Sequence, residues 1–179
     1  MSENLFSNDN VPSHHLPDLA ELAFEPISPV YRKVNLGICV AIISVLMIMA
    51  LVIRFQALIS VPPPLFNASQ YALVIVPLIG VLFCVYQWFA DKQVMFALRE
   101  QDLSLKQGLI FRRLASQPVL RIQHVELKRG PLDRLSGLAK LQVFSAGGAG
   151  HTFEIPGLPI ARAQKIRQFI LTHKDIGAR

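Results

Sequence analysis

Two long apolar stretches dominate the first half of the chain. The first, residues 34–53, holds only Asn35 and Ser44 as clearly polar side chains. A helix of this length rises about 30 Å, which matches the hydrocarbon core of a bilayer. The second, residues 71–89, has the same character, and its internal proline and glycine are common in membrane helices. The pattern predicts two membrane-spanning helices over these ranges.

The segment between the two stretches predicts a reversal of the chain. Residues 62–64 are three consecutive prolines, which cannot continue a helix. The two spans are therefore expected to form a hairpin. Basic residues flank the outer ends of the hairpin, whereas Arg54 is the only basic residue of the connecting loop. Because basic residues favour the cytoplasmic side, we expect both chain ends to be cytoplasmic.

After the second span, apolar residues no longer recur with the period of a helix but at every second position, which indicates β-strands. Gln107–Gly108 predicts a hairpin turn, and Leu109, Phe111 and Arg113 are expected to lead into the following strand. Residues 121–128 form another predicted strand. Its alternation is broken, which suggests either a β-bulge or a strand with neighbours on both faces.

The remaining strands follow from turn residues and renewed alternation. Residues 132–137 predict a compact turn, and the glycine-rich residues 147–150 predict a reversal. Phe153 and Ile155 are then expected to face inward on the last strand. The chain ends with a helical pattern that begins near Pro159, a residue suited to a helix start. Its expected apolar face consists of Ala163, Ile166, Phe169 and Ile170.

These elements predict a fold class and three parts of the chain. The fold class is a two-helix transmembrane hairpin followed by a mainly β barrel or sandwich of six to seven strands, capped by a C-terminal α-helix. Residues 1–30 hold five acidic residues and no Lys or Arg, and are expected to be a largely disordered cytoplasmic tail. Residues 31–90 form the membrane hairpin. Residues 91–175 form the β domain, which is just long enough for one core.

Charge adds a candidate binding surface. From residue 90 onward there are 15 Lys and Arg against 7 Asp and Glu, a net charge of +8. A basic domain beside a membrane favours anionic lipid headgroups. Nucleic acid is excluded as a partner because no stripe of basic and aromatic residues is present. An ordinary solvated surface remains the alternative reading. The candidate lipid- or partner-binding residues are Arg112, Arg113, Lys128, Arg129 and Arg134.

The sequence predicts no catalytic, cofactor or metal site. Cys39 and Cys84 lie in apolar runs without further ligands at metal-site spacing. His124 lies two residues before Glu126, a pair suited to acid–base work, but no nucleophile accompanies it. Structural hydrogen bonding is the favoured role of this pair. The chain is therefore expected not to be an enzyme.

Three stretches resemble a known family: FALREQDLSLKQGLI, RIQHVELKRGPLDRLSGLAKLQVFSAGG and EIPGLP. They are similar to those of the bacterial pleckstrin-homology (PH) membrane proteins of the YdbS-like family, and the resemblance covers residues 32–173. It implies a PH-like barrel of seven strands with a C-terminal helix, in a multi-pass protein of the bacterial plasma (inner) membrane. Genes of this family often lie next to a gene that encodes a larger relative with repeated PH domains. Phosphoinositide binding is not implied, because residues 99–102 contain two carboxylates where eukaryotic PH domains cluster basic residues.

Two functional hypotheses follow. The first is a membrane-anchored, non-enzymatic PH-like interaction module, a subunit or scaffold of a plasma-membrane complex. Its expected partners are other membrane proteins, with the larger repeated-PH relative or a second copy of the chain as candidates. The alternative is a domain that senses anionic lipid through the basic membrane-proximal patch. The sequence leaves both open.

Overall fold

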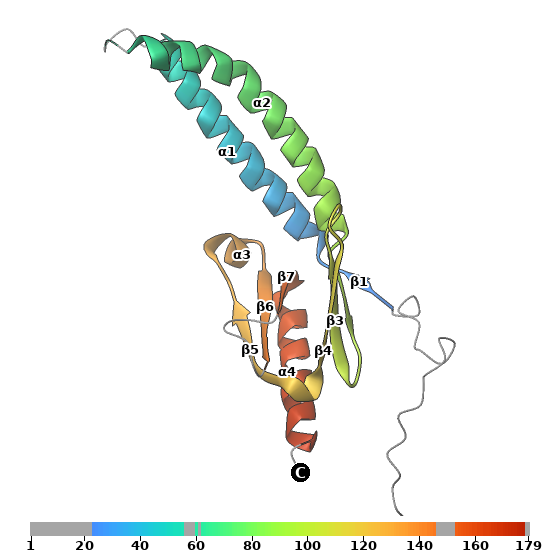
Figure 1. Cartoon of the computed structure of the whole chain (residues 1–179). Helices are drawn as coiled ribbons and strands as arrows, with labels where there is room; N and C mark the ends of the chain where they lie inside the picture. The colour runs from blue at the N-terminus through green and yellow to red at the C-terminus, as the bar shows by residue number, and fades with distance from the viewer. Residues whose placement is uncertain (1–22, 56–59, 61, 146–152, 178–179) are drawn as a thin grey trace, which may run out of the picture.

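Two long helices extend from a β domain that is closed by a C-terminal helix (Figure 1). The structure is a computed structural model that describes residues 23–55, 60, 62–145 and 153–177. The helices are α1, Pro29–Phe55, and α2, Pro63–Lys92. Their most apolar windows reach a mean hydropathy of 3.1 and 2.2, and only 6% of each window is buried. By length and composition, both helices are able to cross a membrane.

Small residues let α1 and α2 approach each other closely. Ala50 of α1 and Ser69 and Gly80 of α2 are buried. A Cβ added at Gly80 would lie 2.6 Å from Cδ1 of Ile43, so no larger residue fits there without a shift. Close backbone contact through small residues is the usual way in which membrane helices associate. The predicted hairpin therefore has a packed interface.

Two antiparallel sheets form the β domain, with strand orders β1-β2-β3-β4 and β5-β6-β7. The strands are Glu25–Pro26 (β1), Met95–Leu98 (β2), Asp102–Gln107 (β3), Arg113–Pro118 (β4), Ile122–Lys128 (β5), Leu138–Ser145 (β6) and Phe153–Pro159 (β7). The helical elements of the domain are the 3-10 turn η3 (Val119–Arg121), α3 (Pro131–Leu135) and α4 (Ile160–Gly177).

The core lies between the two sheets and α4. Leu103 and Leu105 of β3 are buried, as are Phe153 and Ile155 of β7. Three residues of the predicted apolar face of α4 are also buried, and the fourth, Phe169, packs against the core from a half-buried position. The expected bulge is present as a register shift in β5 between Ile122 and His124. The predicted fold class is thus confirmed: two long apolar helices, then a mainly β PH-like domain capped by a helix.

Two local predictions were wrong. Leu109 and Phe111 do not lead a strand, because β4 begins only at Arg113 and the residues before it form an open turn. The cause is Gly108, which has a φ of +99° and turns the chain sharply after β3. Residues 132–137 are not a simple turn, since α3 begins at Pro131, a favoured first residue of a helix. The predicted reversal at residues 147–150 lies outside the described residues.

The boundary of the N-terminal tail also requires correction. Residues 25–26 form β1 and pair with β2, and Ile27 is 7% exposed in the core. The part of the chain before residue 31 therefore contributes to the β domain. The pattern did not reveal this because a two-residue strand shows no period. Most of the predicted tail, residues 1–22, lies outside the described residues.

Candidate functional site

The β domain is joined directly to the start of α1. The backbone N–H of Ser28 donates to the carbonyl of Gly157 in β7 at 3.0 Å. Tyr31, in the first turn of α1, packs against Gly157 so closely that a Cβ added there would lie 2.5 Å from the Cβ of Tyr31. Since Ile27 is anchored in the core just before, α1 leaves the domain in a fixed direction.

A cluster of polar side chains joins α1 and α2 at the same end. Asp91 is 7% exposed, and its two carboxylate oxygens accept hydrogen bonds from Nδ2 of Asn35 at 3.0 Å and Nε2 of Gln87 at 2.9 Å. Arg32 lies near enough to interact electrostatically with Asp91, and its guanidinium stacks over the ring of Trp88 at 4.2 Å. Each carboxylate oxygen of Asp91 therefore accepts at least one hydrogen bond, as a buried polar group requires. The cluster therefore holds α1 and α2 together at the end of the helical hairpin that joins the β domain.

Sequence reasoning missed Asp91. The signal was present, because an acidic residue directly follows an apolar run and a second polar residue, Asn35, lies at the edge of the other span. Only the antiparallel packing of the two helices brings these positions together.

The turn between β3 and β4, called here the tip loop (residues 108–112), exposes large apolar side chains. Ile110 is 69% exposed and Phe111 is 90% exposed. A Cβ added at Gly108 would lie 2.0 Å from the carbonyl oxygen of Phe111, so only glycine fits this turn. Figure 1 shows the end of the β3–β4 hairpin at the level of the last turns of α2.

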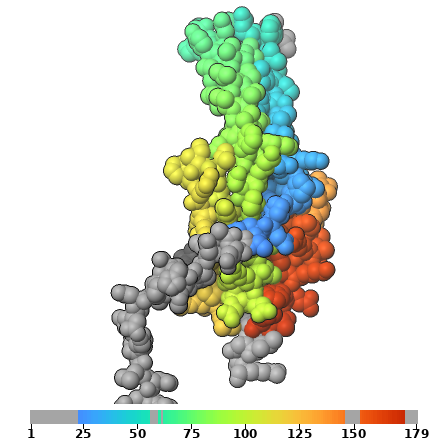
Figure 2. Space-filling view, turned by 90° about the vertical axis from the view of Figure 1, so that its right-hand side faces the viewer, coloured from blue at the N-terminus to red at the C-terminus, as the bar shows by residue number. Residues whose placement is uncertain are grey.

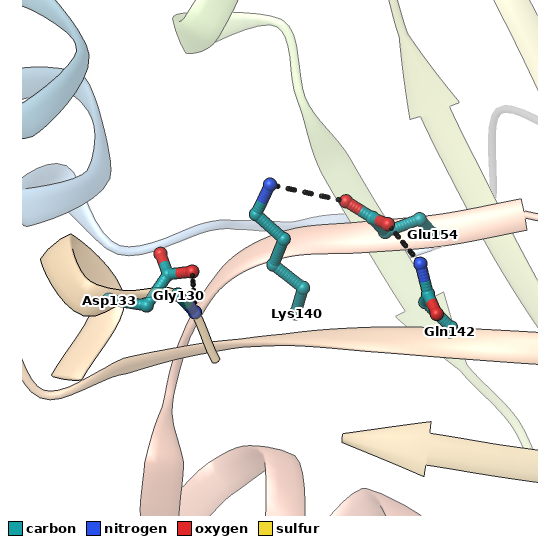
Figure 3. A network of polar contacts seen from close by, with 5 residues as sticks. All are labelled: Gly130, Asp133, Lys140, Gln142 and Glu154. Atoms are coloured by element: carbon teal, nitrogen blue, oxygen red, sulfur yellow. Dashed lines mark hydrogen bonds and ion pairs between the residues drawn. The ribbon is translucent and has the colours of Figure 1, made fainter. Parts of the chain in front are cut away.

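A second exposed feature surrounds α3, called here the α3 corner (residues 128–137). The backbone N–H of Gly130 donates to the carboxylate of Asp133 at 2.9 Å, which caps the short helix (Figure 3). Leu135 is 87% exposed and Leu132 is 47% exposed. The cap therefore holds a short helix that presents two leucines to the surroundings.

The five predicted basic residues fall into two groups. Arg112 and Arg113 are exposed at the tip loop and at the start of β4. Lys128 and Arg134 are exposed in the α3 corner, where Arg129 donates from Nε to a backbone carbonyl of β6 at 2.9 Å and so supports the fold. Figures 1 and 2 show the tip loop and the α3 corner on opposite sides of the base of the helical hairpin. The residues therefore share one end of the domain but not one patch.

A network across β6 and β7 supports the second sheet. Gln142 is 7% exposed and donates from Nε2 to the carboxylate of Glu154 at 2.7 Å, while Nζ of Lys140 lies 3.6 Å from the other oxygen (Figure 3). Each polar group has a partner on the neighbouring strand. The arrangement is that of a structural network between strands.

The residues whose side chains suit acid–base or nucleophilic chemistry include His124, Glu126 and Ser136. His124 and Glu126 are both exposed, and the His124 ring lies 5.7 Å from that of Phe144. The hydroxyl of Ser136 donates to a backbone carbonyl within α3 at 2.6 Å. Among the described residues, no group of three or more metal-ligating side chains occurs.

A hollow of about 480 Å³ lies between β2 and α4. Its lining includes Phe96 and Phe169, with Arg162 at its edge. The guanidinium of Arg162 pairs with Glu25 of β1 and lies 5.2 Å from the centre of the Phe96 ring. Because Arg162 already has an anionic partner, the hollow offers less positive charge than its lining suggests.

The fold and these surfaces define a class of protein: a PH-like β domain attached to two long apolar helices. The sequence profile described as "Bacterial PH domain" matches residues 34–174, and the chain belongs to this family. PH domains are generally non-catalytic interaction modules, and no enzymatic family is indicated.

The chain is similar to a solved structure. It is the crystal structure of a DUF1696 family protein with a pleckstrin-homology domain from Shewanella loihica PV-4. The two chains are 20% identical, the match covers 46% of this chain and 72% of the other, and the TM-score is 0.34. The comparison with curated proteins gave no match.

Proposed function

We propose that this chain is a membrane-anchored, non-enzymatic PH-like interaction module, a subunit or scaffold of a bacterial plasma-membrane complex, with both chain ends cytoplasmic. The observation that carries the proposal is the direct junction between β1, the core residue Ile27 and α1. A domain held in this way keeps one orientation beneath the membrane. Membrane proteins that share the bilayer then meet it at high effective concentration.

The surface of the helical hairpin supports association with another membrane protein. An apolar groove between α1 and α2 is lined by residues that include Ile42, Ile79 and Phe83. Close packing against such a groove is the usual means by which membrane helices bind one another. The groove is therefore the expected contact with a partner, whether a larger relative with repeated PH domains or a second copy of this chain.

Crosslinking in intact membranes, followed by mass spectrometry, tests this proposal. Ile79→Trp would fill the groove, and we expect it to abolish the crosslinks that the natural chain forms with its partner. Leu78→Trp is the matched control, because Leu78 is 62% exposed on α2 but does not line the groove. A natural chain that crosslinks to nothing and purifies as a monomer would refute the proposal.

A second candidate function is recognition of anionic lipid. The observation that favours it is the position of Arg112 and Arg113, which are exposed at the end of the domain nearest to the helical hairpin. Surface charges of this kind attract anionic headgroups in a salt-sensitive manner. The full chain, purified from a mixed bilayer, is expected to retain phosphatidylglycerol in preference to phosphatidylcholine. Arg112→Glu with Arg113→Glu should remove the preference, and equal retention of both lipids by the natural chain would exclude this function.

A further inference from the structure

Among the described residues of the β domain, the two most exposed large apolar side chains lie at the end that carries the helical hairpin. Phe111 and Leu135 are 90% and 87% exposed, and Ile110 and Leu132 accompany them at 69% and 47%. Single exposed apolar residues are common on protein surfaces and need no explanation. Two such pairs, one in the tip loop and one in α3, are less ordinary and indicate an apolar environment.

Both turns hold their shape through built-in constraints. Gly108 sets the path of the tip loop through its positive φ, and the Asp133 cap fixes the start of α3. The exposed side chains are therefore presented by ordered backbone.

The position of the two turns relates them to the membrane. The tip loop and the α3 corner lie on opposite sides of the point where α1 and α2 meet the domain (Figures 1 and 2). If the two apolar helices cross a bilayer, these turns are the parts of the domain nearest to its surface. By contrast, η3 lies at the opposite end of the domain (Figure 1).

Basic side chains accompany each apolar pair. Arg112 and Arg113 follow Phe111 directly, and Arg134 precedes Leu135. The carboxylate of Asp133, which lies among them, is bound to the backbone N–H of Gly130. Apolar residues flanked by Arg or Lys are typical of elements that lie in the headgroup region, where the ring or aliphatic chain is buried and the cation meets lipid phosphate.

We infer that the tip loop and the α3 corner are two membrane-contacting sites that insert Ile110, Phe111, Leu132 and Leu135 into the headgroup region on either side of the helical hairpin. The arginines beside them contact lipid phosphate. The inference rests on the proposed insertion of α1 and α2 into a bilayer. With the hairpin between them, the two sites support the domain at three points and set its tilt against the membrane.

Quenching of tryptophan fluorescence by lipids brominated in the upper acyl chain tests the inference. The single native tryptophan is first removed by Trp88→Phe, which keeps a ring beneath Arg32. Phe111→Trp and Leu135→Trp then report on the two turns. Leu120→Trp is the matched control, because Leu120 is 69% exposed in η3 at the far end. Each full chain is reconstituted into vesicles of phosphatidylethanolamine and phosphatidylglycerol.

We expect several-fold stronger quenching at positions 111 and 135 than at position 120, with emission shifted to the blue. Quenching no stronger than at position 120 would overturn the inference. A blue shift without quenching would also overturn it, because a protein surface, such as a second copy of the chain, would then cover the turns.

Two further variants separate the possible failures. Leu78→Trp reports on α2 itself. Quenching at position 78 without quenching at position 111 would support the proposed membrane anchoring and refute only the inference. Without quenching at either position, the proposed anchoring fails as well. Arg112→Glu with Arg113→Glu should weaken quenching at position 111, whereas Lys165→Glu with Arg167→Glu on exposed positions of α4 should not. Unchanged quenching after the first pair would overturn the role given to the arginines.

Discussion

At the scale of single residues, glycines decide where parts of this molecule meet. Gly157 has a φ of +64° and also faces Tyr31 at a distance that leaves no room for a Cβ. Gly137 has a similar φ of +69°, but a Cβ added there would meet nothing within 4 Å. The two positions therefore separate the cost of backbone strain from the cost of crowding.

Gly157→Ala is expected to lower the free energy of unfolding of the β domain by about 2–4 kcal/mol, since it adds overpacking to the strain of a left-handed residue. Gly137→Ala should cost only about 1–2 kcal/mol, from strain alone. Chemical denaturation of the full chain in detergent measures both. Combining Gly157→Ala with Tyr31→Gly, which also removes the Cβ of Tyr31, should recover part of the loss relative to the sum of the single variants. Strict additivity would show that Tyr31 does not press on Gly157.

Sequence reasoning at this scale succeeded where a residue follows the period of its element. Ile155 and Ile170 are 0% exposed, as their periods predicted. It failed at Phe111, whose alternation placed it in a strand although it is 90% exposed in a turn. An apolar residue in an alternating run has the same pattern whether it faces a core or a membrane surface, so only the backbone path distinguishes the two.

At the scale of elements, the shortest strand has the largest consequence. β1 has two residues, yet its pairing with β2 and the burial of Ile27 attach α1 to the domain. The helical hairpin depends in turn on small residues, above all Gly80. Both features lie at contacts between elements that are distant in the sequence.

Ile27→Ala is expected to destabilise the junction by about 2–4 kcal/mol, because it leaves a cavity in the core. Val30→Ala, at a residue that is 40% exposed, should change stability by less than about 1 kcal/mol. Hydrogen exchange of the β1 and β2 backbone amides in the full chain provides the measurement. Equal exchange in the two variants would contradict the anchoring role of Ile27.

Gly80→Leu is expected to push α1 and α2 apart, because its Cβ would overlap the side chain of Ile43. Cys39 of α1 and Cys84 of α2 lie close enough to interact across this interface. Oxidative crosslinking between them, read by mass spectrometry, should therefore fall strongly in the variant. Gly37→Leu is the control, since a Cβ added at Gly37 meets nothing within 4 Å. Efficient crosslinking in the Gly80 variant would show that the helices do not depend on this contact.

At the scale of the whole molecule, the proposed membrane topology decides on which side of the bilayer the β domain lies. Basic residues flank the outer ends of α1 and α2, and the loop region between the helices holds few charges. The proposed topology places that loop outside the cell and the β domain inside.

Labelling with a membrane-impermeant maleimide tests this topology. In a chain that carries Cys39→Ala and Cys84→Ala, Ser60→Cys should be labelled in intact spheroplasts. Leu120→Cys should react only after lysis, although both positions are exposed in the structure. The opposite order of labelling would place the β domain outside the cell and contradict the proposed function.

The sequence by itself determined the order and kind of the longer elements, but not β1 or α3. Long apolar runs, alternating runs and an amphipathic C-terminal segment follow from local periods, which depend only on how a helix or strand presents its side chains. It also identified the basic residues at positions 112, 113, 128, 129 and 134. Tertiary structure decided how they are used: Arg129 supports a backbone carbonyl, and the exposed members divide between two turns. It also decided that Asn35, Gln87 and Asp91 meet and that Ile27 joins the core, because such contacts arise from the packing of segments that carry no common local pattern.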